Sequence, residues 1–242
     1  MAKLDRKVMK FGGTSLSDEK VRRSAYRHIL EEVKHAKVLV VVSAMGRYPD
    51  PYATDTLLSM GSPLLTKEEK ARLVSMGEQL SALIVASELL DIGISAYALP
   101  FHKNGILSDH QYEYANVLAL SARCVQQALS QHQVVVASGF IAQAPCGDVT
   151  TLGRGGSDFS AVLFAHMLGL DEVDIYTDVD GVYDIDPKVS SFAIRYERLS
   201  YDEMLNMKVR VLHERCVQYA KEKKIRIRLR GTFSQGEGTL IA

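Results

Sequence analysis

The chain has 242 residues, 47% of them hydrophobic, which is enough for one large domain or two small ones. It carries 29 basic and 29 acidic side chains, and this zero net charge argues against a nucleic-acid or acidic-surface partner. The N-terminus lacks the apolar core of a secretory signal, and the longest apolar run, residues 38–42, is too short to span a membrane.

The first part of the chain predicts a strand, a helix and a second strand. Residues 7–11 form a short strand, and Gly12 and Gly13 make the turn out of it. A helix begins near Ser17, which is a good capping residue. Residues 37–43 are a β-branched run without alternation, as expected of a strand that is covered on both faces.

A long helix follows, and a glycine interrupts it. Thr66 and Glu69 fit a capping box, and the helix runs to about Asp91. Gly77 costs this helix roughly 1 kcal/mol relative to alanine. Close packing explains such a glycine, and so does a ligand that approaches Glu78; packing is the more frequent cause.

The second half continues the alternation. Further strands are predicted at residues 94–99, 134–138, 173–177, 225–230 and 238–242, and helices at 116–131, 157–168 and 200–223. Residues 139–151 are irregular or a small hairpin, and residues 100–115 have no assignment. The basic stretch at 221–230 is open to a nucleic-acid interpretation, but zero net charge and the lack of interleaved aromatics favour a solvated strand face.

Strands that alternate with helices predict one compact α/β domain over residues 1–242, with a largely parallel, helix-covered sheet. In such sheets ligands bind at the carboxyl ends of the strands. We therefore expect a site built from the loops that follow Phe11, Ser43, Ser138 and Thr177.

The glycine-rich stretch at residues 150–158 is the strongest local signal. Its glycines let the backbone approach an anion, Ser157 can cap the helix that follows, and Arg154 offers a planar fork of donors. A purely structural loop needs the glycines and the cap, but neither of the charges at Arg154 and Asp158. An anion site is the favoured interpretation.

Five motifs taken together resemble one family. They are residues 10–15, 40–46, 75–78, 151–158 and 176–188, and in this order they resemble the aspartokinases of the amino-acid kinase superfamily. The resemblance runs from about Val8 to Ala242. It implies a three-layer αβα sandwich around a mainly parallel open sheet, with an amino acid bound over the N-terminal half and ATP, with Mg²⁺, over the C-terminal half. It also implies a cytoplasmic enzyme and a homodimer formed through the N-terminal half.

The resemblance also implies residue roles. Lys10 matches the lysine that bridges the phosphates and stabilises the transferring group, and Asp158 matches the acidic residue that organises the reacting centre; a favourable charge at the helix start is the alternative explanation for Asp158. The amino-acid positions are Ser43, Thr54, Glu78, Arg154 and Ser157, with Arg154 on the α-carboxylate and Glu78 facing the ammonium group. The phosphate and nucleotide positions, besides Lys10, are Gly12, Gly13, Ser15, Thr177, Asp178, Tyr183, Asp186 and Lys188.

Three departures from the family pattern stand out. The regulatory ACT domains of most aspartokinases are absent from this sequence, so we expect no feedback inhibition by lysine or threonine. Arg210 replaces a lysine that reaches the nucleotide and keeps its charge but not its shape, so that Lys208 is a possible substitute. Phe159 stands where the family often has a small polar residue.

Cysteine and histidine positions indicate no metal site. Cys124, Cys146 and Cys216 are far apart, which favours reduced thiols in a cytoplasmic protein. His102 and His110 fall in the unassigned segment with loose spacing, which is more typical of a surface loop than of metal ligands.

These observations leave three functional hypotheses. The first is phosphorylation of the side-chain carboxylate of L-aspartate by ATP. The second is a kinase of the same fold that acts on another amino acid, an acylated amino acid or a nucleotide. The third is a catalytically weak binding or partner subunit, which the altered stretch at residues 208–214 and the missing regulatory domains motivate.

Overall fold

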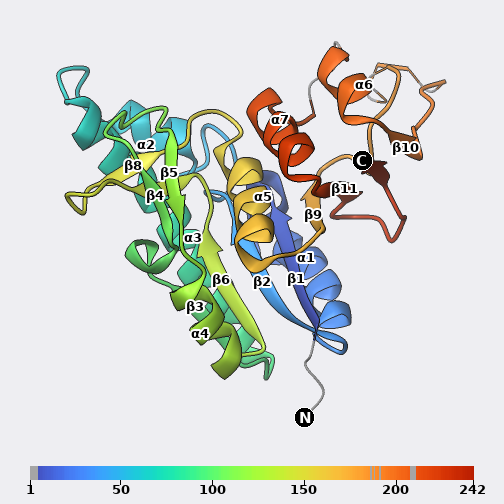
Figure 1. Ribbon diagram of the computed structural model, residues 1–242, viewed down its shortest axis with the longest axis horizontal. Helices are drawn as coiled ribbons and strands as arrows, with labels where there is room; N and C mark the ends of the chain where they lie inside the picture. The colour runs from blue at the N-terminus through green and yellow to red at the C-terminus, as the bar shows by residue number, and fades with distance from the viewer. Residues whose placement is uncertain (1–4, 186, 188, 191, 208–210) are drawn as a thin grey trace.

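The computed structural model describes residues 5–185, 187, 189–190, 192–207 and 211–242. Eight strands of this described chain form one twisted sheet in the order β10-β12-β11-β9-β1-β2-β6-β3 (Figure 1). The strands are β1 (Asp5–Phe11), β2 (Ala36–Val42), β3 (Ala96–Leu99), β6 (Val134–Ser138), β9 (Glu172–Thr177), β10 (Arg198–Leu199), β11 (Arg226–Gly231) and β12 (Thr239–Ile241). All neighbours pair in parallel except β11 with β12. The predicted α/β fold with a mainly parallel open sheet is confirmed.

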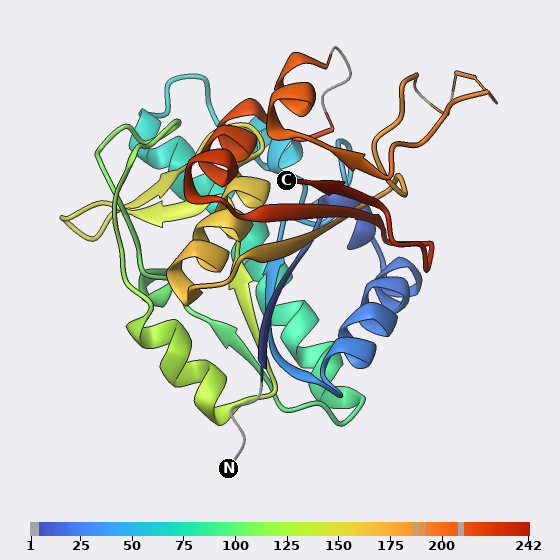
Figure 2. The same cartoon turned by 45° about the vertical axis from the view of Figure 1, so that its right-hand side comes forward.

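Helices cover both faces of this sheet. They are α1 (Glu19–Glu32), α2 (Thr54–Met60), α3 (Lys67–Asp91), α4 (Arg123–Gln131), α5 (Gly156–Leu168), α6 (Tyr201–Asn206) and α7 (Glu214–Lys223), with short 3-10 turns at Gly13–Ser15 and Phe101–Lys103. Buried residues of α1 and α3 pack on one face, and those of α4, α5 and α7 pack on the other. Figure 2 shows α1 and α5 on opposite sides of β1. The result is a three-layer αβα sandwich.

Strand alternation decides which side chains face which layer. In β1, Met9 and Phe11 lie in the apolar cluster with α1 and α3, whereas Val8 lies in the cluster with α5. Lys10 is two residues after Val8, so it shares the α5 face. The Lys10 side chain therefore points toward α5, the helix that carries Asp158.

A second, four-stranded sheet was not predicted. It has the order β5-β4-β7-β8 and consists of β5 (Val117–Leu120), β4 (Ile106–Ser108), β7 (Ile141–Gln143) and β8 (Val149–Thr151). The predicted helix over 116–131 is therefore wrong in its first part. Residues 117–120 pair antiparallel with β4, and this pairing overrides their local helical pattern. The antiparallel β7–β8 pair confirms the small hairpin that was one of the two expectations for residues 139–151.

Helix α3 begins with the predicted capping box, in which Thr66 and Glu69 hydrogen bond to each other's backbone amides. A Cβ on Gly77 would lie 2.7 Å from the carbonyl oxygen of Tyr52 and 2.8 Å from Cβ of Ala44, so close packing accounts for this glycine. By length and hydropathy alone α3 would qualify as a membrane-spanning helix, but half of its most apolar 18-residue stretch is buried inside the protein. Packing on the sheet accounts for that part of its apolar composition.

The four strand ends predicted to build the site lie side by side. Phe11 is level with Val42 on one side and with Tyr176 on the other, and Val42 is level with Ser138. The loops after β9, β1, β2 and β6 thus leave from adjacent positions at one edge of the sheet. This arrangement is the one expected from the parallel order.

Candidate active site

Lys10 and Asp158 meet at this edge. Lys10 Nζ lies 2.5 Å from Asp158 Oδ1, and the two side chains are only 8% and 13% exposed. One side chain comes from the end of β1 and the other from the first turn of α5. The contact holds the ammonium group in a fixed position beside the loop that leaves β1.

The loop after β1 packs tightly against the loop after β2. A Cβ on Gly13 would lie 2.5 Å from the carbonyl oxygen of Gly46 and 2.6 Å from that of Ala44, so only glycine fits here. The amide of Gly46 in turn donates to the Gly13 carbonyl at 2.9 Å. Ser15 is fully buried, and its hydroxyl lies 2.6 Å from that of Thr232, a residue that sequence reasoning missed. Thr232 therefore anchors this loop to the segment after β11.

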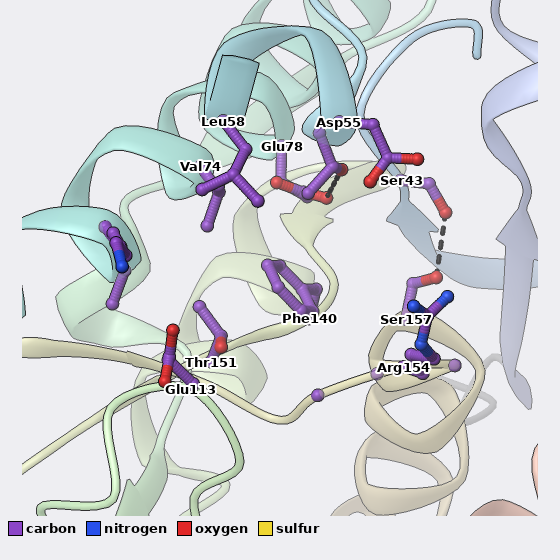
Figure 3. A pocket seen from close by; sticks show the side chains of 16 residues that line it. Ser43, Asp55, Leu58, Val74, Glu78, Glu113, Phe140, Thr151, Arg154 and Ser157 are labelled. Atoms are coloured by element: carbon purple, nitrogen blue, oxygen red, sulfur yellow. Dashed lines mark hydrogen bonds between the residues drawn. The ribbon is translucent and has the colours of Figure 1, made fainter. Parts of the chain in front are cut away.

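A cavity of about 360 Å³ opens beside the start of α5, the helix that carries Asp158 (Figure 3). It brings together every residue predicted to bind the amino acid, namely Ser43, Thr54, Glu78, Arg154 and Ser157. These residues come from four separate segments of the chain: the end of β2, the start of α2, the middle of α3 and the start of α5. Their common location is a result of the fold and not of sequence proximity.

Glu78 is the one carboxyl group buried in the wall of this cavity. It is 3% exposed, its Oε1 accepts hydrogen bonds from the Ala44 amide at 3.2 Å and from the Thr54 hydroxyl at 3.5 Å, and its Oε2 has no hydrogen-bond partner within the described chain. Burial raises the pKa of Glu78 from its ordinary 4.5 to about 8, although both hydrogen bonds oppose this increase. A buried carboxyl group with an unsatisfied oxygen needs either a proton or a cationic ligand.

The start of α5 differs from the prediction. The helix begins at Gly156, and its capping position is Gly155, with φ of 65° and no side-chain cap among the described residues. The expected cap by Ser157 is therefore wrong, because Ser157 lies in the first helical turn, where its hydroxyl accepts a 2.8 Å hydrogen bond from Ser43 (Figure 3). The absence of a side-chain cap in this part of the structure leaves the positive end of the helix available to an anion.

Other residues line the same cavity and were not predicted. They are Asp55, Leu58, Lys70, Ala71, Val74, Glu113 and Phe140, whereas Thr151 and the glycines at 153, 155 and 156, which also line it, belong to the predicted glycine-rich stretch. Phe140 has φ of 64°, an uncommon conformation for a residue with a side chain. Only the position of Asp55, next to a predicted substrate residue, offered a signal in the sequence.

A second cavity, of about 290 Å³, lies along the loop after β9. It contains two of the predicted nucleotide residues, Asp178 and Tyr183, and the missed residues Phe233 and Ser234. The Tyr183 hydroxyl donates to Asp180 at 2.5 Å, and the Thr177 hydroxyl donates to Asp178 at 3.1 Å. The predictions for Asp186, Lys188, Lys208 and Arg210 lie outside the described residues.

The remaining sequence questions also have structural answers. Phe159 is not among the residues that line the first cavity but packs in the core, with its ring 5.4 Å from that of Tyr219. The arginines of β11 have acidic partners, as Arg228 does with Glu172 and Arg230 with Asp174, so the basic strand is a paired surface. Within the described residues no group of three or more histidine, cysteine or acidic side chains is arranged to hold a metal ion.

Comparison with known proteins agrees with this geometry. Residues 5–231 match the model of the amino acid kinase family. Aspartokinase 1 of Bacillus subtilis and an aspartokinase of Thermus thermophilus are each 39% identical to the chain over 97% of its length. The chain spans only 60% and 58% of these two relatives, that is, about three fifths of each.

Solved structures give the same result. Escherichia coli aspartokinase III in complex with aspartate and ADP superposes with a TM-score of 0.84 at 25% identity, covering 98% of this chain and 64% of that one. Aspartate kinase from Synechocystis has the same TM-score at 32% identity, covering 98% and 39%. Uridylate kinase from Archaeoglobus fulgidus, at 21% identity and a TM-score of 0.67, shares the fold. The chain belongs to the amino acid kinase family.

Proposed function

We propose that this protein transfers the γ-phosphoryl group of ATP to the side-chain carboxylate of L-aspartate, giving 4-phospho-L-aspartate. One observation carries the proposal. A single cavity holds a buried carboxyl group with a free oxygen, Glu78, together with Arg154 and the uncapped start of α5. These groups complement the ammonium and carboxylate groups of a free amino acid.

Each end of the substrate has a counterpart. The ammonium group of aspartate would supply the hydrogen bond and positive charge that Glu78 Oε2 lacks. Arg154 would grip the α-carboxylate through its planar fork of donors. Ser43, Thr54 and Ser157 complete the cavity wall and would orient the amino acid. Similarity to aspartokinases, one of them solved with aspartate and ADP, supports this choice of acceptor.

The transfer itself needs charge neutralisation more than proton transfer. A free aspartate side chain has a pKa of about 3.9, so it is already a nucleophile at neutral pH. One of its carboxylate oxygens attacks the γ-phosphorus, the bond from phosphorus to the bridging oxygen breaks, and ADP leaves with the electron pair. The obstacle is the repulsion between two anions, which Lys10 and the backbone amide of Gly13, in the loop that Gly12 begins, would counter. Asp158 would hold Lys10 in place and would not act as a base.

ATP would lie over the C-terminal half, with Thr177, Asp178 and Tyr183 from the loop after β9, and with Asp186, Lys188 and Arg210 outside the described residues. Mg²⁺ in nucleotide sites is usually held by one or two carboxylates together with phosphate oxygens. The described residues contain no group of three acidic side chains arranged to hold a metal ion, which fits an ion that is held mainly by the phosphates of ATP. Asp158, which pairs with Lys10 through Oδ1, would contribute its other carboxylate oxygen. When bound, the ion would neutralise phosphate charge.

We also propose that residues 1–242 act as a single cytoplasmic catalytic domain that forms a homodimer through α3. Met76, Leu83 and Leu90 are spaced by seven residues on the outer side of this helix and are 57%, 61% and 55% exposed. A helix–helix seam uses two apolar positions in every seven, and these three exposed residues supply one of them. Leu83→Glu should give a monomer in light scattering, whereas Leu118→Glu, at a similarly exposed leucine of β5, should not; a dimer that survives Leu83→Glu contradicts this interface.

The activity is tested by trapping the product. The protein is incubated with Mg-ATP, hydroxylamine and a panel of acceptors, because hydroxylamine converts acyl phosphates to hydroxamates, which form a coloured complex with added Fe(III). Hydroxamate formed with aspartate alone supports the proposal. Turnover only with another amino acid, an acylated amino acid or a nucleotide, measured by ADP release, identifies a different kinase. ATP binding without turnover for any acceptor indicates a binding subunit.

A further inference from the structure

The start of α7 packs directly on the glycine-rich loop, although the two are about sixty residues apart in the chain. A Cβ on Gly155 would lie 2.3 Å from Cβ of His213, the residue that caps α7. The start of α7 therefore covers this side of the loop.

Arg215, in the first turn of α7, makes four contacts with that region. Its Nη2 donates to the carbonyl oxygen of Ala115 at 2.7 Å, and its Nη1 donates to that of Leu152 at 3.2 Å. Its guanidinium carbon lies 4.9 Å from the ring centre of Tyr114 and 4.6 Å from that of Phe159. A planar cation between two aromatic rings, with donors on two carbonyls, is held in one orientation.

Tyr114 extends the contact to the next residue of the loop. A Cβ on Gly153 would lie 2.1 Å from a carbon of the Tyr114 ring, so the ring rests on the bare backbone of this glycine. The Ala115 amide also donates to the Thr151 carbonyl at 2.8 Å. Residues 151–153, which immediately precede Arg154, are thus held by contacts with the 112–115 segment and with Arg215 of α7.

We propose that Arg215 is a positioning residue for the amino-acid substrate, which fixes the backbone at Leu152 and Gly153 and thereby orients Arg154 and Ser157 in the cavity. The inference rests on the proposed function. Arg215 does not line the cavity itself, so it acts through the loop. The Phe159 ring packs against the Arg215 guanidinium. This contact gives a role to Phe159, which stands where the family often has a small polar residue.

Hydrogen exchange of the unliganded protein tests the positioning without any substrate. Arg215→Lys keeps the charge but cannot donate to both carbonyls in one plane, and Arg215→Ala removes all four contacts. Both variants should lose amide protection in the peptide covering residues 150–158. Lys223→Ala is the matched control, because Lys223 is also on α7 and lies 5.5 Å from a tyrosine ring, that of Tyr219.

Kinetics then test the consequence for the substrate. Arg215→Lys should raise KM for aspartate by about tenfold and change KM for ATP by less than about twofold, since only the amino-acid loop loses its support. Phe159→Ser should give a smaller effect in the same direction. Circular dichroism establishes that each variant is folded.

The outcomes separate the two proposals. Loop protection and KM for aspartate that stay at wild-type values in folded Arg215→Lys and Arg215→Ala overturn the positioning role. Equal increases in both KM values also overturn it, because they indicate a general loss of structure. A wild-type protein that does not phosphorylate aspartate contradicts the proposed function, while exchange still reports on the contact between α7 and the loop.

Discussion

Glu78 gives the sharpest prediction, because its burial couples stability and substrate binding to pH. Burial raises the pKa of this carboxyl group to about 8 in the folded protein, from an ordinary value of 4.5. The folded protein therefore keeps a proton on Glu78 over a range in which the unfolded chain has lost it. Stability falls with rising pH wherever the folded state binds more protons, so the loss runs from about pH 4.5 to about pH 8.

Glu78→Gln removes the titrating group with little change in shape. Each pH unit in this window corresponds to about 1.4 kcal/mol, so wild type should lose about 4 kcal/mol of stability relative to Glu78→Gln between pH 5 and pH 8. Urea unfolding of both proteins across this range measures the difference. Asp91→Asn, at the exposed end of the same helix, is the control and should show no such trend.

The same group should control aspartate binding. An ammonium group needs the ionised form of Glu78, so binding releases a proton and KM for aspartate should fall about tenfold per pH unit up to about pH 8. Glu78→Gln should have a high KM for aspartate that does not vary with pH, and an unchanged KM for ATP. A constant stability difference across the range, together with parallel KM profiles, would refute the reasoning.

Three further expectations follow from contacts in the site. Lys10→Ala should reduce kcat by about a thousandfold in the hydroxamate assay, because it removes the cation at the reacting centre; wild-type kinetics would rule out that role. Gly13→Ala should abolish measurable ATP binding in calorimetry, since two carbonyl oxygens occupy the space of the new methyl group, and wild-type affinity would contradict this. Gly77→Ala should lower the melting temperature, since the clash with the Tyr52 carbonyl outweighs a helix-propensity gain of about 1 kcal/mol; a higher melting temperature would reverse that balance.

Local patterns determined much of the architecture. The capping boxes at Thr66 and Ser200 begin α3 and α6 where they were expected, because a helix start depends on side chains within one turn. The β-branched runs became central strands, and the parallel order brought the four predicted loops to one edge. The secondary-structure prediction failed at residues 117–120. These residues form a strand because they pair with β4, which the local pattern did not predict.

The candidate site was predictable as a set of residues but not as a geometry. The family resemblance identified Ser43, Thr54, Glu78, Arg154 and Ser157, and one cavity is lined by all of them. No sequence pattern indicates that Ser157 accepts a hydrogen bond from Ser43 instead of capping its helix, because the bond joins residues 114 positions apart. Thr232 and Arg215 were missed for the same reason, since no local pattern marks them, and Asp55 was missed although it directly follows Thr54.

The sequence by itself therefore determined most strands of the main sheet, the helix starts at the two capping boxes and the chemical types that the site contains, because these depend on side chains that are close in the chain. Tertiary structure alone decided burial and long-range contact. Burial makes Glu78 a group with a raised pKa, and the fold places Arg215 against the loop that carries Arg154. Both effects arise from the surroundings of a side chain, which only the packed layers define.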